Sequence, residues 1–167
     1  SKETDFNERI LSKLMGEFNT YNVLAVYATA ILLGQDKEKV KEIIATLDGA
    51  PGRFISYTST TGVIGIVDYA HTPDAVANVL STINKMKNNG KLVTVIGCGG
   101  DRDKGKRPIM AKIAYDMSDT VILTADNPRS ENVQDILADM QTGLPENFKE
   151  KVFIIVDRHT AIQKACE

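Results

Sequence analysis

The stretch Val95-Ile-Gly-Cys-Gly-Gly-Asp-Arg-Asp-Lys-Gly-Lys-Arg-Pro108 links an apolar run, 91–96, to a helical pattern at 109–117. A strand, a glycine turn and a helix start in this order present backbone N–H groups and the positive end of a helix to an anion. The alternative is an ordinary strand-to-helix connection whose charges are solvated. The sequence therefore predicts a βα unit in which Pro108 opens the helix and the glycine loop is a candidate anion site.

Two phosphate-binding motifs match this loop only in part. Gly100 to Lys106 has the spacing G-x-x-x-x-G-K of a P-loop, but Arg107 stands where a Ser or Thr should bind Mg²⁺. Gly97 to Arg102 begins like the dinucleotide fingerprint, but Arg102 takes the place of the third glycine. We therefore expect a ligand loop of another kind, or no ligand loop.

Apolar runs of strand length alternate with helical patterns on both sides of this loop. The expected strands 53–58 and 62–69 are joined by a threonine and glycine turn. Beyond them the expected helices 73–87, 108–117, 131–143 and one from about Thr160 alternate with the expected strands 91–96, 120–125 and 152–157. Such alternation is typical of right-handed βαβ units on a parallel sheet. The predicted fold class is α/β, with a mostly parallel sheet flanked by helices.

The first fifty residues follow a different pattern. A helix is expected at 21–33, ended by Gly34, and a second helix follows Asp36 as its N-cap. The run 10–18 is compatible with one strand of a sheet that lies mostly elsewhere, and 1–8 is expected to be frayed. Gly49-Ala-Pro-Gly52 is the predicted domain boundary. Both chain ends are expected to be cut ends.

The composition bounds the class of protein. The chain has 167 residues, 43% hydrophobic and 25% charged, with a net charge of −2, which suits a soluble globular protein and not a nucleic-acid-binding module. No signal peptide or membrane span is recognisable. Two cysteines without framework or metal spacing favour a reducing, cytoplasmic location.

Polar side chains follow the predicted strands, where open parallel sheets bind ligands. In 68–73, Thr72 and Pro73 predict an ordinary helix start, whereas Asp68 could accept hydrogen bonds from sugar hydroxyls or close a plain turn after a buried strand. His71 alone is more often a surface or capping residue. The polar run 157–160 is expected to cap a helix.

Asp126-Asn-Pro-Arg129 combines an acceptor, an amide and a guanidinium. This set suits an amino acid, with its carboxylate on the arginine and its ammonium on the aspartate. The alternative is a turn into a helix capped by Ser130. Because the chain has no complete phosphate loop, metal-ligand cluster or nucleophile with a base, we expect it to bind a small molecule without catalysing alone.

Five motifs resemble those of the Mur ligases, the amide-forming enzymes of peptidoglycan synthesis. In chain order they are Gly16-Glu-Phe-Asn-Thr-Tyr-Asn22, Gly52-Arg53, Asp68-Tyr-Ala-His-Thr-Pro73, Gly97-Cys-Gly-Gly-Asp-Arg-Asp-Lys-Gly-Lys-Arg-Pro108 and Asp126-Asn-Pro-Arg129. The resemblance implies that residues 1–50 end a central ATP-binding domain and that residues 51–167 form most of a Rossmann-like C-terminal domain.

The resemblance also implies an activity. It implies an ATP-dependent ligase that adds meso-diaminopimelate to UDP-MurNAc-L-Ala-D-Glu through an acyl phosphate. Its partners would be these substrates, ATP with Mg²⁺, and the N-terminal and central domains of the same protein, without nucleic acid or membrane. The family's phosphate loop and metal ligands lie upstream, so this segment alone is expected to be inactive. The main alternative is a stand-alone nucleotide- or amino-acid-binding module, while Arg107 disfavours a nucleotide kinase.

The resemblance assigns two groups of binding residues and no catalytic residue or metal ligand. The group expected at ATP is Asn19 and Asn22 near the adenine, with Arg53, Asp68 and the adjacent His71 on the ribose and phosphate side. The group expected at diaminopimelate is Arg102, Asp126, Asn127 and Arg129. Since Arg129 can pair with a second carboxylate, the motif favours diaminopimelate over lysine.

Overall fold

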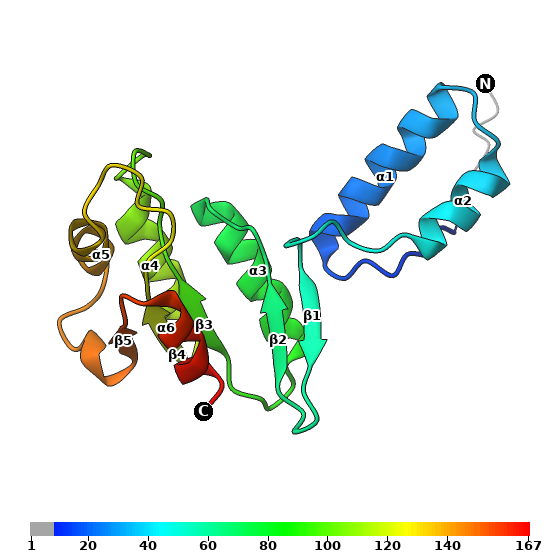
Figure 1. Ribbon diagram of the computed structural model, residues 1–167. Coiled ribbons are helices and arrows are strands. Elements are labelled where there is room, and N and C mark those ends of the chain that lie inside the picture. The colour runs from blue at the N-terminus through cyan, green and yellow to red at the C-terminus, as the bar shows by residue number, and fades with distance from the viewer. Residues whose placement is uncertain (1–8) are drawn as a thin grey trace. The chain divides into compact units, whose positions relative to one another are not determined.

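The computed structural model describes residues 9–167, which form two compact units. The first unit comprises the chain up to Tyr57 together with Gly65–Asp68, and the second comprises Thr58–Ile64 and Tyr69–Glu167. The expected frayed segment 1–8 lies outside the described residues. Figure 1 labels the helices and strands.

The first unit contains two helices, α1 (Glu17–Leu32) and α2 (Lys37–Thr46). Asp36 caps α2 as expected, because its carboxylate accepts a hydrogen bond from Lys39 N at 2.9 Å. Gly34, with φ +77°, follows the end of α1. Val40 and Ile44 of α2 are buried, whereas α1 contains no buried residue.

The expected strand at 10–18 was wrong. Residues 9–15 have no regular structure, and Gly16, with φ +95°, turns the chain directly into α1. The helix therefore starts at Glu17, four residues before the predicted start, with an acidic side chain in its first turn.

The strands β1 (Ile55–Thr58) and β2 (Ile64–Val67) form a two-stranded sheet of their own. A turn joins them, in which Gly62 N donates to Ser59 O at 3.1 Å. The expected burial of 63–67 was wrong, since Ile64 is 62% and Val67 51% exposed. A strand with one partner, outside the parallel sheet, lacks the helices that cover such a sheet on both faces.

The second unit is built on a three-stranded parallel sheet in the order β3-β4-β5. Its strands are β3 (Val93–Ile96), β4 (Thr120–Leu123) and β5 (Val152–Ile154). Its helices are α3 (Pro73–Met86), α4 (Lys106–Met117), α5 (Val133–Gln141) and α6 (Arg158–Ala165), with a 3₁₀ turn at Phe148–Glu150. The predicted α/β class with a parallel sheet is confirmed.

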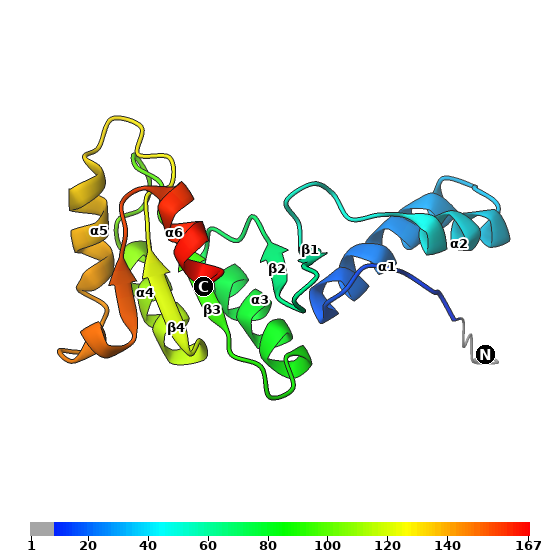
Figure 2. The ribbon, with the colours of Figure 1, turned by 60° about the horizontal axis from the view of Figure 1, so that its bottom comes forward.

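The core lies between this sheet and its helices. Figure 2 shows α4 behind the sheet, α6 in front of it and α5 beside β5. The central strand β4 is wholly buried from Val121 to Leu123, as expected of a parallel strand with both faces covered. Ala111 and Ala114 are fully buried on α4, which packs against α3 and α5. Small side chains there allow the helices to approach closely.

The predicted start of α3 at Pro73 was confirmed, whereas α4, α5 and α6 each begin two residues away from the predicted position. α4 begins at Lys106, so Pro108 is its third residue; this costs no hydrogen bond, because first-turn N–H groups have no helical acceptor. α5 begins at Val133, and its N-cap is Asn132 instead of the expected Ser130. Thr72 and Asp157 cap α3 and α6 as expected. Among residues 9–167, no helix combines the length and the apolarity that crossing a membrane requires.

Candidate substrate site at the ends of β3 and β4

Two loops leave the carboxyl ends of neighbouring strands. The β3–α4 loop (97–105) follows Ile96, and the β4–α5 loop (124–132) follows Leu123, its partner in the parallel register. Thr124 N donates to Ile96 O at 3.0 Å, so the two loops begin side by side. This is the edge at which a parallel sheet presents its ligand-binding side chains.

Glycines let the two backbones approach more closely than side chains would permit. A Cβ at Gly97 would lie 2.5 Å from Thr124 O, and a Cβ at Gly100 would overlap Pro128 O. Gly100 N donates to Asn127 O at 2.9 Å. These positions therefore require glycine because of backbone contact between the loops.

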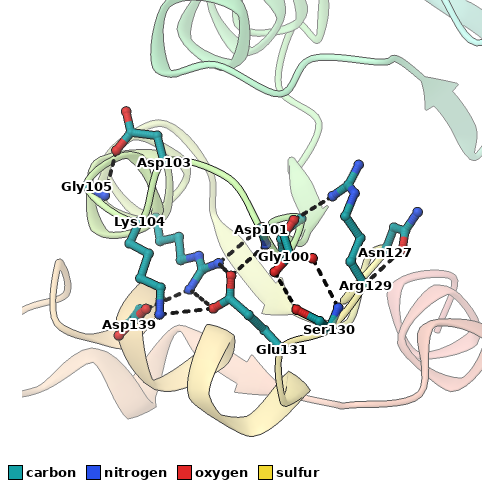
Figure 3. A network of polar contacts seen from close by, with 12 residues as sticks. Gly100, Asp101, Asp103, Lys104, Gly105, Asn127, Arg129, Ser130, Glu131 and Asp139 are labelled. Carbon is teal, nitrogen blue, oxygen red and sulfur yellow. Dashed lines mark hydrogen bonds and ion pairs between the residues drawn. The ribbon is translucent and has the colours of Figure 1, made fainter.

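Asp101 and Ser130 join the loops through side chains (Figure 3). The Asp101 carboxylate accepts hydrogen bonds from Ser130 Oγ at 2.7 Å and from Ser130 N at 3.2 Å. The bonds from Ser130 lower the pKa of Asp101. In return, Asp101 N donates to Glu131 Oε1 at 2.6 Å. Asp101 has φ +52°, a strained conformation for a residue other than glycine, which these contacts hold in place.

Arg107 lies beneath these contacts and is 1% exposed. Its guanidinium donates to both oxygens of Glu131, at 2.7 and 2.9 Å, to Asp139 at 2.8 Å and to Gly99 O at 3.2 Å. The hydrogen bonds from Arg107 lower the pKa of Glu131 to about 2, and those to Glu131 raise the pKa of Arg107. Lys104 adds a pair with Glu131 at 3.2 Å.

The residues predicted to bind diaminopimelate gather around Gly97–Gly99. Measured from the position of a glycine Cβ, Asp126 Cβ lies 3.1 Å from Gly97, and Arg129 Nη1 and Arg102 Cγ lie 2.8 and 3.8 Å from Gly99. Arg129 Nη1 also donates to Gly100 O at 2.7 Å. The side chains of two arginines and one aspartate thus border one short segment, through Arg129 Nη1, Arg102 Cγ and Asp126 Cβ.

Their remaining hydrogen-bonding capacity faces outward. Arg102, Asp126, Asn127 and Arg129 are all exposed. Within residues 9–167, Arg102 makes no hydrogen bond or ion pair, and Asn127 uses its side-chain oxygen for Arg129 N at 3.3 Å. The site offers free donors to an anion and a free carboxylate to a cation. The binding role of these residues stays a prediction.

The residues predicted at the adenine lie on α1, beside a cavity of about 280 Å³. The cavity is lined by Ile10, Ser12, Leu14, Asn19, Thr20, Val23 and Leu24. Asn19 Nδ2 donates to Met15 O at 2.7 Å, and Asn19 Oδ1 accepts from Asn22 Nδ2 at 3.1 Å. The cavity's lining combines apolar side chains with one amide and two hydroxyl groups, and the role of Asn19 and Asn22 at the adenine stays a prediction.

The other predicted ATP residues are divided between the two units. Asp68 accepts from Phe54 N at 2.9 Å and supports Phe54 at φ +50°, so the alternative of a turn-closing aspartate has direct support. Arg53, in the same unit, is exposed. His71, in the second unit, contacts Tyr69 O through Nδ1 at 3.0 Å and lies edge-on to the Tyr69 ring. Across residues 9–167, no cluster of His, Cys, Asp and Glu forms a metal-binding group.

Sequence reasoning missed the pairs Arg107–Glu131 and Asp101–Ser130. In the sequence, Arg107 stands out only as the residue in place of a Mg²⁺-binding hydroxyl, and Ser130 is predicted only as a helix cap. Neither pairing follows a local periodicity, since their members are 24 and 29 residues apart. The one available signal was that both loops had to meet at the same sheet edge.

Comparison with known proteins identifies the family to which the chain is similar. The family model described as Mur ligase, glutamate ligase domain, matches residues 52–167. A UDP-N-acetylmuramoyl-L-alanyl-D-glutamate–2,6-diaminopimelate ligase of Cytophaga hutchinsonii is 54% identical over 154 residues, which are 92% of this chain and 32% of that protein.

Solved structures agree with the sequence comparison. A ligase of the same name has a TM-score of 0.65 at 42% identity, over 95% of this chain and 32% of its own. Mycobacterium tuberculosis folylpolyglutamate synthase complexed with ADP and AMPPCP has a TM-score of 0.72 at 22% identity, over 94% of this chain and 34% of its own, a likeness of fold. This chain spans about a third of the length of these relatives. Since the family model covers most of the sequence and the relatives are this similar, the chain belongs to the Mur ligase family, whose glutamate ligase domain its residues 52–167 match.

Proposed function

We propose that this chain supplies the amino-acid site of an ATP-dependent ligase that joins meso-diaminopimelate to UDP-MurNAc-L-Ala-D-Glu in the cytoplasm. The observation that carries the proposal is the convergence of Arg102 and Arg129 on Gly99, with Asp126 beside Gly97. The names of the relatives at 54% and 42% identity support the same substrate.

The proposed site recognises both ends of a long zwitterion. The guanidinium of Arg102 or Arg129 pairs with a carboxylate, Asp126 receives an ammonium, and Asn127 adds an amide donor. Diaminopimelate carries a second carboxylate that lysine lacks. Bound substrate would cover the arginine that pairs with this second carboxylate, and without that carboxylate the desolvation of the arginine is uncompensated, which penalises lysine.

Residues 51–167 are proposed to be the C-terminal domain and residues 1–50 the end of a central ATP-binding domain. The start of the family match at residue 52 supports this boundary. The chain's share of its relatives, 32%, leaves room for the central domain that would hold the phosphate loop and Mg²⁺. Asn19 and Asn22 are proposed to hold the adenine, with Arg53, Asp68 and His71 on the ribose and phosphate side.

ATP would supply the chemistry by activating the dipeptide. The substrate carboxylate attacks the γ-phosphorus and ADP leaves. The diaminopimelate amine then attacks the acyl carbon, and the tetrahedral intermediate expels phosphate to leave an amide. In this scheme the residues of this chain bind and orient the amine; they transfer no group themselves, and we expect the 167-residue segment alone to be inactive.

Hydroxylamine trapping by the full-length enzyme tests the proposal. With ATP, the UDP-linked dipeptide and hydroxylamine in place of the amino acid, we expect a hydroxamate together with ADP and phosphate. AMP and pyrophosphate as products would contradict the acyl phosphate. The alternative, a stand-alone binding module, predicts no ATP-dependent product with any amino acid.

A further inference from the structure

Arg107 is a buried charged residue that forms no hydrogen bond with the residues proposed to bind diaminopimelate or ATP. It is the second residue of α4 and its side chain is 1% exposed. Its Nη atoms bind Glu131, Asp139 and Gly99 O, and its buried Nε has no partner among residues 9–167. None of its hydrogen bonds reaches Arg102 or Arg129.

The hydrogen bonds of Arg107 connect the backbone segments next to Arg102 and Arg129, the two arginines proposed to bind substrate. Gly99, whose carbonyl accepts from Arg107, is the residue against which Arg102 and Arg129 lie. Glu131, which accepts two bonds from Arg107, is two residues beyond Arg129 and also binds Asp101 N, next to Arg102. The Arg107 guanidinium thus links the backbone beside Arg102 with the loop segment that follows Arg129.

Stability alone does not account for an arginine at this place. A buried ion pair often contributes no more than apolar side chains of the same volume, because both charges lose their hydration. The unpartnered Nε adds a further cost. The planar guanidinium of Arg107 orients Glu131, because two parallel hydrogen bonds to one carboxylate fix the angle as well as the distance between the two groups.

We propose that Arg107 and Glu131 form a positioning pair that sets the separation of Arg102 and Arg129, and thereby selects an amino acid with two carboxylates. This proposal rests on the diaminopimelate site proposed above. A polar group misplaced by about 1 Å reduces the rate by as much as ~10²-fold, so a modest rotation of one loop is sufficient.

The test uses Glu131→Gln and Arg107→Lys in the full-length enzyme. We expect both variants to raise KM for diaminopimelate about tenfold or more, with KM for ATP and for the UDP-linked dipeptide within about twofold of wild type. The preference for diaminopimelate over lysine falls in parallel. Asp116→Asn is the matched control, because it removes an exposed carboxylate pair with Lys112 on the same helix, α4; it should change none of these constants.

A double-mutant cycle separates positioning from simple loss of structure. If Glu131 acts through Arg129, Glu131→Gln has little further effect on KM for diaminopimelate in an Arg129→Gln background. Additive effects, or equal increases in all three KM values, would overturn the proposal. If Arg107→Lys does not fold, Asp139→Asn replaces it, since Asp139 is 41% exposed and binds the same guanidinium.

The wild-type enzyme distinguishes the two levels of failure. If it makes no product with diaminopimelate, the proposed function fails and the positioning role fails with it. If it makes product and the variants keep their KM and their selectivity, only the positioning role is contradicted.

Discussion

The Arg107 guanidinium donates to both carboxylate oxygens of Glu131, at 2.7 and 2.9 Å, across 24 residues of sequence. The bond ties the first turn of α4 to the end of the β4–α5 loop, so the two loops that carry the proposed substrate residues are held as one unit. Further hydrogen bonds between the loops, from Gly100 N to Asn127 O, from Ser130 to Asp101, from Asp101 N to Glu131 and from Arg129 to Gly100 O, add to this connection.

Acid should weaken this connection. The pKa of Glu131 in the folded protein, about 2, is below its ordinary value of 4.5, chiefly because Arg107 hydrogen-bonds the carboxylate. The unfolded state therefore binds more protons between these pH values, so the stabilisation by Glu131 is complete above about pH 4.5 and is lost as the pH falls towards 2. Thermal unfolding of wild type and Glu131→Gln between pH 2 and 7 measures this stabilisation.

The expected result is a wild-type advantage at pH 6 that shrinks below pH 4.5. A difference in unfolding midpoint between the two proteins that is constant across this range would contradict the assigned pKa.

Gly100→Ala should separate the loops. Its methyl group would overlap Pro128 O, and overpacking of this kind costs about 1–3 kcal/mol. Gly65→Ala is the control, because a methyl group there meets nothing closer than Tyr57 O at 4.0 Å. Chemical denaturation should show a loss for the first variant and a change within about 0.5 kcal/mol for the second. Equal stability of both variants would contradict the close approach.

The two cysteines should differ sharply in reactivity. Burial raises the pKa of Cys98 to about 11, so little thiolate is present at pH 8, whereas Cys166 is exposed. An aromatic disulfide reagent should modify one thiol of the folded protein quickly and the second only after unfolding. Modification of Cys98 at the rate of Cys166 would show that the glycine loop opens in solution.

Arg129→Gln should remove selectivity together with affinity. We expect kcat/KM for diaminopimelate to fall about 10²-fold or more, while the slow reaction with lysine changes little. Arg158→Gln is the control, since this exposed arginine also binds a backbone carbonyl at the strand ends, Ala125 O at 3.2 Å. A parallel loss for both amino acids would show that Arg129 does not contact the second carboxylate.

The sequence predicted the parallel sheet because that information is local. Buried runs such as 120–123 and caps such as Thr72 and Asp157 are specified by neighbouring residues. The runs 10–18 and 62–69 misled because their apolar side chains resemble a buried strand, although no such strand forms at 10–18 and β2 remains exposed.

The meeting of the two loops at one sheet edge was predictable from the sequence, whereas the contacts between them were not. Strand ends in a parallel sheet had to bring 97–102 and 126–129 to one edge. Which carboxylate would pair with Arg107 depends on the path of both loops, and that path depends on backbone contacts at Gly97 and Gly100. The start of α5 was misplaced for the same reason, because Ser130 binds Asp101 and leaves the capping to Asn132.

Amide formation by the full-length enzyme with meso-diaminopimelate and with L-lysine tests the central claim most directly. The convergence of Arg102 and Arg129 on Gly99 predicts that kcat/KM is higher for diaminopimelate, by ~10⁴-fold or more for a site that must hydrogen-bond its substrate. Equal values, or a preference for lysine, would contradict the assignment of these arginines to a second carboxylate.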